Sequence, residues 1–152
     1  MNHTRKATVA DAIEVANNLR TEDLDELLRL GHDRLGVTIS VVFSDVAVSF
    51  FNTDGVIAGV AGICPGAEDG VGIVWMLCTP AVQTNPHTFV RQAKKWLKTE
   101  EANYRLLWNL ADARNIYHNK LLKMLGFNAL RSIPAGPYKL PFLEIVKLCA
   151  YH

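Results

Sequence analysis

Hydrophobic residues follow two patterns along the chain, and from Val46 onward the strand pattern is clearest. Residues 71–78, VGIVWMLC, are apolar without interruption, which is typical of a central strand buried on both faces. The apolar stretches VAVSFF and VIAGVAGI flank NTDG, so we expect two strands joined by a tight turn. Glycines at positions 59, 62 and 72 suggest bulges or close packing. Further segments with strand character are residues 4–7, YRLLWNLAD, FNALRSI and PFLEIVKLC.

The helix pattern, with apolar residues three and four positions apart, appears first near the N-terminus. Thr8 is placed to cap a helix, with Asp11 at the third helical position. We expect Ile13, Ala16 and Leu19 to supply the buried stripe of this helix.

The segment RTEDLDELLRLG predicts a second helix, with Thr21 as its cap and Gly31 as its stop. Acidic residues favour the positive end of a helix, so we expect those in this segment on a solvated face rather than in a catalytic site. The next segment, GVTISVVFSD, is ambiguous. Its β-branched residues favour a strand, whereas the spacing of its valines also permits a short buried helix.

Two further helices are predicted after residue 78. Asn85 is placed to cap the first, with Pro86 at the first helical position, where a missing N–H costs nothing. Asn115 opens the second, which we expect to end at Gly126. The predicted apolar faces comprise Phe89, Val90, Ala93, Trp96 and Leu97 in the first helix, and Leu121, Met124 and Leu125 in the second.

In chain order these segments predict β-α-α-β-β-β-α-β-α-β-β, which is an α/β fold with a mixed sheet. Neither an internal repeat nor a low-complexity linker interrupts the sequence. We therefore expect residues 1–152 to form a single domain.

Composition and charge narrow the functional classes. Hydrophobic residues make up 49% of the chain and charged residues 20%, which fits a folded globular protein. The net charge of +1, without a long basic run, argues against a nucleic-acid or membrane surface. The N-terminus lacks an uninterrupted apolar segment, and no apolar run reaches the roughly 18 residues of a membrane span. We therefore expect a soluble protein without a signal peptide.

The cysteines and histidines do not suggest a metal site. Cys64, Cys78 and Cys149 form no C-x-x-C pair and are interpreted as reduced thiols, with Cys78 in a buried strand. His87 and His118 have no partner at the spacing of metal ligands, and we interpret both as isolated surface residues.

The element order, together with DARNIYHNKLLKMLGF at residues 112–127, resembles the GNAT superfamily of acyl-CoA acyltransferases. The resemblance spans nearly the whole chain and is most specific over residues 71–98 and 115–127. It implies a GNAT-like mixed sheet in which two parallel strands splay apart, with acetyl-CoA in the opening. It also implies that the cofactor's pyrophosphate binds N–H groups at the start of the following helix, in an Arg/Gln-x-x-Gly-x-Gly/Ala loop.

Within that loop the chain departs from the family pattern. Gln83 matches the first position, whereas Pro86 and Thr88 stand where glycine or another small residue is usual. Proline removes an N–H donor and threonine adds bulk, so we expect a weakened phosphate cradle. If acetyl-CoA binds, the resemblance places these residues around it: Cys78, Thr79, Gln83, His87, Thr88 and Asn115.

The catalytic groups implied by the resemblance are not found at their usual positions. The superfamily often uses a glutamate near the central strand as base and a tyrosine in the last helix as acid. Here IVWMLC holds no acidic residue, and Leu122 occupies the tyrosine position. Tyr117 lies five residues earlier, about 140° round the helix, and is a poor substitute. The remaining candidate acid is Asp112, whose alternative interpretation is a side chain that bonds the turn before Asn115.

A narrower resemblance concerns LRTEDLDEL, LWNLADARN and GPYKLPFLEIVKL. These are similar to acetyltransferase-like proteins of tailed phages, including internal virion proteins of short-tailed phages. The resemblance implies a protein of the virion or its assembly, located in the virion or the host cytoplasm, that contacts other phage proteins. We therefore expect a GNAT-fold phage protein with a degenerate acetyl-CoA site and no cofactor. The alternative is an active acetyl-CoA-dependent N-acetyltransferase, because positioning an amine against a thioester supplies much of the rate.

Overall fold

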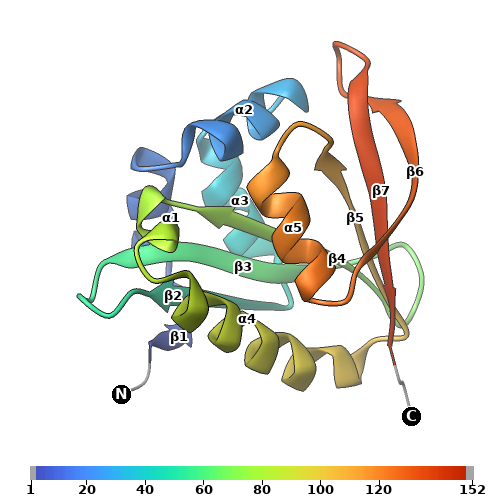
Figure 1. The fold of residues 1–152 in the computed structure, drawn as a ribbon. Helices are drawn as coiled ribbons and strands as arrows, with labels where there is room; N and C mark the ends of the chain where they lie inside the picture. The colour runs from blue at the N-terminus through green and yellow to red at the C-terminus, as the bar shows by residue number, and fades with distance from the viewer. Residues whose placement is uncertain (1–2, 150–152) are drawn as a thin grey trace.

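The structure is a computed structural model that describes residues 3–149. It is built on a seven-stranded sheet with strand order β1-β2-β3-β4-β5-β7-β6 (Figure 1). Neighbouring strands are antiparallel except β4 and β5, which are parallel, so the predicted mixed sheet is confirmed. The strands are β1 (Thr4–Lys6), β2 (Val46–Phe51), β3 (Ile57–Pro65), β4 (Val71–Cys78), β5 (Leu106–Asp112), β6 (Asn128–Ala135) and β7 (Leu140–Leu148).

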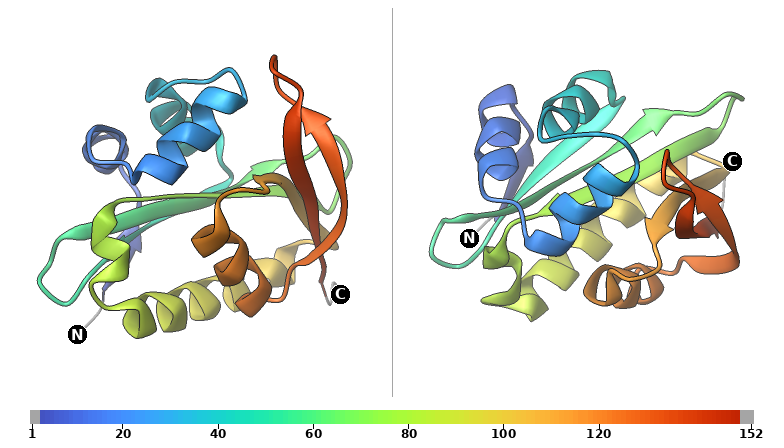
Figure 2. Two further views of the ribbon diagram at one scale, coloured as in Figure 1. Left: turned by 45° about the horizontal axis from the view of Figure 1, so that its top comes forward. Right: turned by 90° about the horizontal axis from the view of Figure 1, so that it is seen from above.

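Helices cover both faces of the sheet (Figure 2). On one face lie α1, α2 and α3, and on the other lie α4 and α5. Two short 3-10 helices, η1 and η2, flank α4. The helices are α1 (Val9–Asn17), α2 (Thr21–Arg29), α3 (Leu35–Phe43), η1 (Pro80–Gln83), α4 (Pro86–Glu100), η2 (Glu101–Asn103) and α5 (Ile116–Met124).

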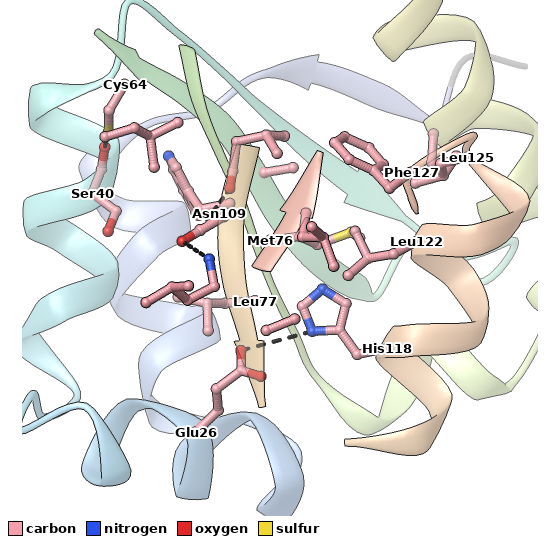
Figure 3. Close-up of a pocket in the computed structure, with 18 of the residues that line it drawn as sticks. Glu26, Ser40, Cys64, Met76, Leu77, Asn109, His118, Leu122, Leu125 and Phe127 are labelled. Carbon is pink, nitrogen blue, oxygen red and sulfur yellow. Dashed lines mark hydrogen bonds and ion pairs between the residues drawn. The ribbon is translucent and has the colours of Figure 1, made fainter. Parts of the chain in front are cut away.

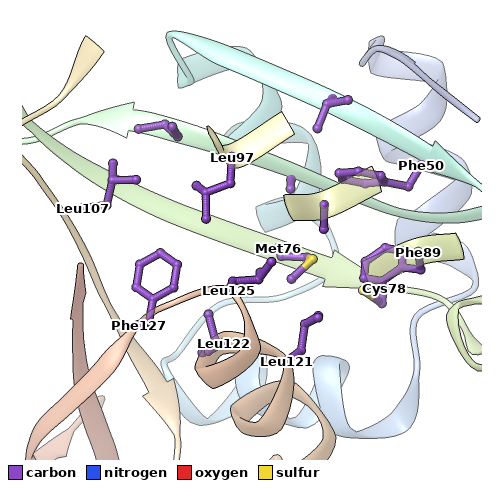
Figure 4. Packing of buried hydrophobic residues seen from close by; sticks show 14 of the residues in the cluster. Phe50, Met76, Cys78, Phe89, Leu97, Leu107, Leu121, Leu122, Leu125 and Phe127 are labelled. Carbon is purple, nitrogen blue, oxygen red and sulfur yellow. The ribbon is translucent and has the colours of Figure 1, made fainter. Parts of the chain in front are cut away.

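The hydrophobic core is divided by the sheet into two clusters. The larger cluster lies between the sheet and helices α4 and α5 (Figure 4). It includes Phe50 and Phe89, whose rings pack edge to face with their centroids 5.2 Å apart. The smaller cluster lies under α1 and α3 and includes Val37 and Trp75. Because β4 contributes to both clusters, it is the central strand that its apolar sequence predicts.

The predicted start of α1 is confirmed. Thr8 Oγ1 accepts a hydrogen bond from Asp11 N–H at 3.1 Å, and the Asp11 carboxylate accepts one from Thr8 N–H at 3.1 Å. The two bonds form a capping box. The predicted buried stripe is wrong at Ile13, whose side chain is 50% exposed. Ala16 is buried as predicted, together with Ala12 one turn earlier, and Ile13 lies about 100° round the axis from Ala12.

The second helix is present, but its predicted cap is wrong. Thr21 is the first residue of α2, and Arg20 occupies the cap position without a capping side-chain hydrogen bond. Arg20 is fixed there by its backbone N–H, which donates to Cys78 C=O at 2.9 Å. The helix stops as predicted just before Gly31, whose φ of 83° is readily adopted by glycine.

The ambiguous segment after α2 is a helix, α3. Of its residues only Val37 is buried, and it packs with α1 against β3. Contact with α1 and the sheet therefore outweighs the strand preference of its β-branched residues. The other side of α3 leaves a stripe of large hydrophobic side chains exposed: Leu35, Ile39, Val42 and Phe43.

Helices α4 and α5 begin where predicted, with Asn85 and Asn115 at their cap positions. The predicted inward face of α5 is wrong at Met124, which is 52% exposed. The helix buries Leu121 and Leu125, one turn apart, together with the adjacent Leu122. Met124 falls outside the arc that these three positions define.

The glycines of the early strands show both features expected of them. A Cβ on Gly62 would lie 2.7 Å from the Trp75 ring, so the ring packs directly on the strand backbone. Next to Gly59 the pairing of β2 with β3 shifts register, because Phe50 pairs with Gly59 and Phe51 with Ile57.

Candidate functional site

The parallel strands β4 and β5 separate soon after they begin. Their register pairs Val71–Ile73 with Leu106–Trp108 and then ends, although both strands continue. Asn109 lies in the fork. Its Nδ2 donates to Val74 C=O at 2.7 Å, and its Oδ1 accepts from Leu110 N–H at 2.6 Å (Figure 3). The predicted splayed pair is therefore confirmed, and an amide side chain replaces the next rung of the ladder.

Beyond the fork, the edge of β4 that faces β5 has lost its neighbour. Val74 C=O and Cys78 N–H both lie on this edge, since each bonds a side chain on that side. Strand alternation directs the N–H and C=O of Met76, midway between them, to the same edge. The β4–β5 ladder does not reach Met76. Met76 thus offers one donor and one acceptor to whatever occupies the opening.

A cavity of about 240 Å³ fills this opening. Its lining includes Met76 and Leu122 from the core beneath α4 and α5, and Trp75 from the core beneath α1 and α3. The cavity therefore passes through the sheet at the fork. Glu26 of α2 and His118 of α5 project into it from the side where both strands end (Figure 3).

Helix α2 crosses the ends of the separated strands, and two of its acids bind them. Asp23 Oδ2 accepts from Cys78 N–H of β4 at 2.7 Å, and Glu26 Oε1 accepts from Asp112 N–H of β5 at 2.7 Å. Asp23 is 2% exposed and Glu26 8% exposed, so the predicted solvated face is wrong for both. The physical reason is the fork, which leaves strand N–H groups without ladder partners for these carboxylates to accept.

Asp23 is fully engaged in holding the elements together. Its Oδ1 accepts from Arg20 Nη1 at 2.9 Å and from Asn115 Nδ2 at 2.9 Å, which ties α2 to the start of α5. The Arg20 guanidinium in turn lies 4.8 Å from the centre of the Tyr117 ring. These contacts make Asp23 a structural clamp.

Glu26 combines anchoring with a place in the cavity wall. Its Oε2 lies 3.8 Å from His118 Nδ1, and the two side chains are 11% and 12% exposed. Burial raises the pKa of Glu26, with His118 the largest opposing influence. A carboxyl group with a raised pKa is suited to accept a proton near neutral pH. The interpretation of His118 as an isolated surface residue is wrong, because the first turn of α5 directs it toward α2.

Asp112, the predicted candidate acid, is completely buried and is not part of the cavity lining. Its Oδ1 accepts from Arg114 N–H at 2.9 Å, which is the turn contact of the alternative interpretation. Its Oδ2 forms an ion pair with Arg29 at the end of α2. The carboxylate is thus occupied by the β5–α5 turn and by α2.

Three of the residues predicted to surround acetyl-CoA lie inside the packed elements. Cys78 is buried, and its pKa is raised well above the ordinary value by burial and by the charge of Asp23. Asn115 is 2% exposed, and its Nδ2 donates a hydrogen bond to Asp23 Oδ1. Thr79 is 3% exposed, and its Oγ1 donates to Ile57 C=O at 2.8 Å.

The other three predicted residues gather where α4 begins. Gln83 and His87 are exposed, whereas Thr88 is buried and its N–H faces Asn85 Oδ1 at 3.5 Å. A groove of about 480 Å³ lies beside them, and exposed Arg91 and Lys94 add charge to the positive helix end. The arrangement suits an anionic ligand. The groove is lined by Pro86, His87, Val90, Arg91, Lys94 and Met124.

Sequence reasoning missed Glu26 and His118, although one signal was available. The inward face of α2 follows positions 23, 26, 27 and 30, a helical repeat that contains Leu27 and Leu30. Asp23 and Glu26 interrupt that repeat with acids on the apolar side. Acids on an apolar face indicate either buried pairs or a site.

No protein-family model and no curated protein sequence matches the chain. Solved structures match it over nearly its whole length. A GNAT-family acetyltransferase from Streptococcus pneumoniae aligns with a TM-score of 0.64 at 17% identity, covering 97% of this chain and 98% of that one. A GNAT-superfamily phosphinothricin acetyltransferase from Sinorhizobium meliloti, in complex with acetyl-CoA, gives 0.70 at 12% identity, with 96% and 87% covered.

The chain has the GNAT fold. An aminoglycoside acetyltransferase in complex with coenzyme A also aligns, with a TM-score of 0.67 at 14% identity and with 95% and 93% of the chains covered. The structural alignments establish the shared GNAT fold. At identities this low they do not establish an activity, which has to be argued from the site.

Two classes of feature are absent from the described part of the GNAT fold. Among residues 3–149, no helix is both long and apolar enough to cross a membrane. Within the same range, no cluster of three or more histidine, cysteine, aspartate or glutamate residues could hold a metal ion.

Proposed function

We propose that the protein binds an acyl-CoA at the fork of β4 and β5 and transfers the acyl group to an amine. The observation that carries this proposal is the cavity through the split sheet with Glu26 in its wall. Support comes from the solved structures, since three with this fold are described as acetyltransferases and two of these contain acetyl-CoA or coenzyme A.

The residues that would hold the cofactor's phosphates lie at the start of α4 and along the groove beside it. N–H groups at the start of α4, with Gln83, His87 and Thr88 nearby, would bind the pyrophosphate. Arg91 and Lys94, which line the groove, would attract the one remaining phosphate of the CoA. Pro86 supplies no N–H, so we expect weaker binding than a glycine-rich loop would give.

The chemistry required of the chain is modest. An amine must lose a proton as its nitrogen attacks the thioester carbon, and Glu26 lines the cavity in which the two would meet. Its raised pKa makes it a better proton acceptor than an exposed glutamate. The apolar walls exclude water, which favours transfer to the amine over hydrolysis.

Calorimetry with acetyl-CoA, followed by detection of free CoA on adding a panel of primary amines, tests the proposal. We expect saturable binding, and CoA release that falls by about 100-fold in Glu26→Gln. Glu14→Gln, on the exposed side of α1, is the matched control and should behave as wild type. No heat of binding at millimolar acetyl-CoA would refute the proposal.

A second candidate function is the virion or assembly role that the narrower sequence resemblance implies. Two observations favour it: Leu122 is buried at the usual tyrosine position, and α3 exposes an apolar stripe suited to protein contact. Mass spectrometry of purified phage particles is the test. Recovery of the protein at a fixed number of copies per particle, in the absence of acetyl-CoA binding, would favour this function over acyl transfer.

A further inference from the structure

The cavity-facing side of α5 carries one titratable group, one turn before Leu122. His118 and Leu122 are four residues apart, so they lie on the same face of the helix, and both line the cavity. Leu122 has no proton to give. Acyl transfer from a thioester nonetheless releases a thiolate, which leaves faster when it is protonated as the bond breaks.

Contacts on two sides fix the position of His118. The backbone N–H of His118 donates to Asn115 Oδ1 at 3.4 Å, and Asn115 Nδ2 donates to Asp23 Oδ1 at 2.9 Å. These two hydrogen bonds connect the first turn of α5 to α2. The Nδ1 side of the ring faces Glu26 at 3.8 Å. The ring lies between Glu26 on one side and Met76 and Leu122 on the other (Figure 3).

Two other candidate proton donors are directed elsewhere. The ring of Tyr117 stacks with the guanidinium of Arg20 at 4.8 Å, and the cavity lining does not include it. The thiol of Cys78 is buried and is likewise absent from the lining. Within the described residues, His118 is the partly buried titratable side chain of α5 that reaches the cavity.

We propose that His118 protonates the sulfur of the departing CoA, in place of a tyrosine at position 122. This inference rests on the proposed acyl transfer. The amine nitrogen bonds to the thioester carbon and gives its proton to the Glu26 carboxylate, while the carbon–sulfur bond breaks. The imidazolium of His118 gives its proton to the thiolate, so that CoA leaves as a thiol. When the products leave, the Glu26 carboxyl group loses a proton and the imidazole gains one, which restores the starting pair.

His118→Gln separates this role from a structural one. With acetyl-CoA we expect kcat to fall by about 100-fold while KM changes by less than about threefold. With an acetyl thioester of an electron-poor thiophenol, whose thiolate leaves without a proton, the variant should retain most of the wild-type rate. His3→Gln is the control and should match wild type with both substrates, because His3 precedes β1 and is not part of the cavity lining.

The outcomes distinguish this inference from the proposed function. An equal loss with both thioesters would show that His118 only supports the structure, and an unchanged rate would show that it has no role. Either result overturns the inference while acetyl-CoA binding, measured by calorimetry, stands. Wild-type protein that fails to bind acetyl-CoA overturns both. His118→Asn, with its unfolding midpoint measured, repeats the test if the glutamine variant is unstable.

Discussion

At the scale of single residues, burial of the Glu26 carboxyl favours its use as a proton acceptor but lowers the stability of the fold. Burial raises its pKa, which suits a proton acceptor, but the same burial makes the ionised form costly in the folded state. The pair with His118 offsets only part of that cost. Stability lost at one position in exchange for reactivity is a common feature of enzyme sites.

Glu26→Gln should therefore raise the thermal unfolding midpoint at neutral pH, by an amount equivalent to about 1–2 kcal/mol. The pKa is raised in the folded state from an ordinary value of 4.5, so the carboxyl destabilises the fold only where it is ionised. The gain should disappear as pH falls below about 4.5. Thermal unfolding from pH 4 to pH 8 measures this. A variant less stable than wild type at pH 7 would contradict it.

Asp11 shows the opposite behaviour. Burial acts to raise its pKa, but hydrogen bonds from Ser49 and Thr8 and the charge of Arg5 outweigh burial and lower it below the ordinary 3.8. Asp11→Asn should cost about 2–3 kcal/mol of folding free energy, since it removes the charge that pairs with Arg5 and one of the two oxygens that accept hydrogen bonds from Arg5, Thr8 and Ser49. Wild type should lose this contribution as pH falls through the lowered pKa. Urea unfolding at several pH values, with exposed Asp54→Asn as control, tests the prediction.

Asp11 and Glu26 also show which single-residue features can be predicted from the sequence. Thr8 and Asp11 were predictable, because a capping box is a local pattern with a fixed spacing. Glu26 and His118 were not, because their burial depends on a fork that leaves distant N–H groups unpaired. A helical repeat interrupted by acids was the available sign.

At the scale of elements, α2 packs against one end of the cavity and is held there by three contacts. Two are the hydrogen bonds that Asp23 and Glu26 accept from the ends of β4 and β5. The third is the turn between β6 and β7, where a Cβ on Gly136 would lie 2.2 Å from the carbonyl oxygen of Arg29. Glycine is required there, since the backbones are in contact and its φ is 72°.

Gly136→Ala should displace the end of α2 and lower the unfolding free energy by more than about 2 kcal/mol. Gly55→Ala is a matched control, because Gly55 has a similar φ of 78° with nothing within 4 Å of an added Cβ. Hydrogen exchange should show faster exchange in α2 for the first variant only. Equal destabilisation of both would mean that the contact with Arg29 contributes nothing.

Element prediction succeeded where a local signal and the packing agree, as in β4, α4 and α5. The segment that became α3 remained ambiguous, because its apolar residues fit either a strand or a helix. Only its contact with α1 and β3 selects the helix. Met124 was misplaced for a similar reason, since periodicity does not show where a buried arc ends.

At the scale of the whole molecule, the fork depends on Asn109. Replacing it by alanine leaves Val74 C=O and Leu110 N–H without their side-chain partners. We expect a loss of about 2–4 kcal/mol in urea unfolding, from two backbone groups at about 1–2 kcal/mol each. Asn103→Ala, at an exposed position before β5, is the control. A loss below about 0.5 kcal/mol would show that the strands part without the amide.

The mixed sheet could be anticipated from the order of elements, whereas the separation of β4 and β5 followed from the family resemblance. Periodicity marks both as buried strands but does not reveal that they pair over only three residues each. The cavity, and the acids that α2 brings to it, follow from that separation.

A passage through the sheet has a kinetic consequence. If the acyl donor enters from the α4 side and the amine from the α2 side, neither must leave before the other arrives. The Cys78 thiol is sealed between the elements, so no acyl group needs to rest on the protein between two half-reactions. Double-reciprocal plots at several amine concentrations should therefore intersect. A reagent that joins the amine to CoA through a short linker would occupy both entrances at once and bind far more tightly than either half.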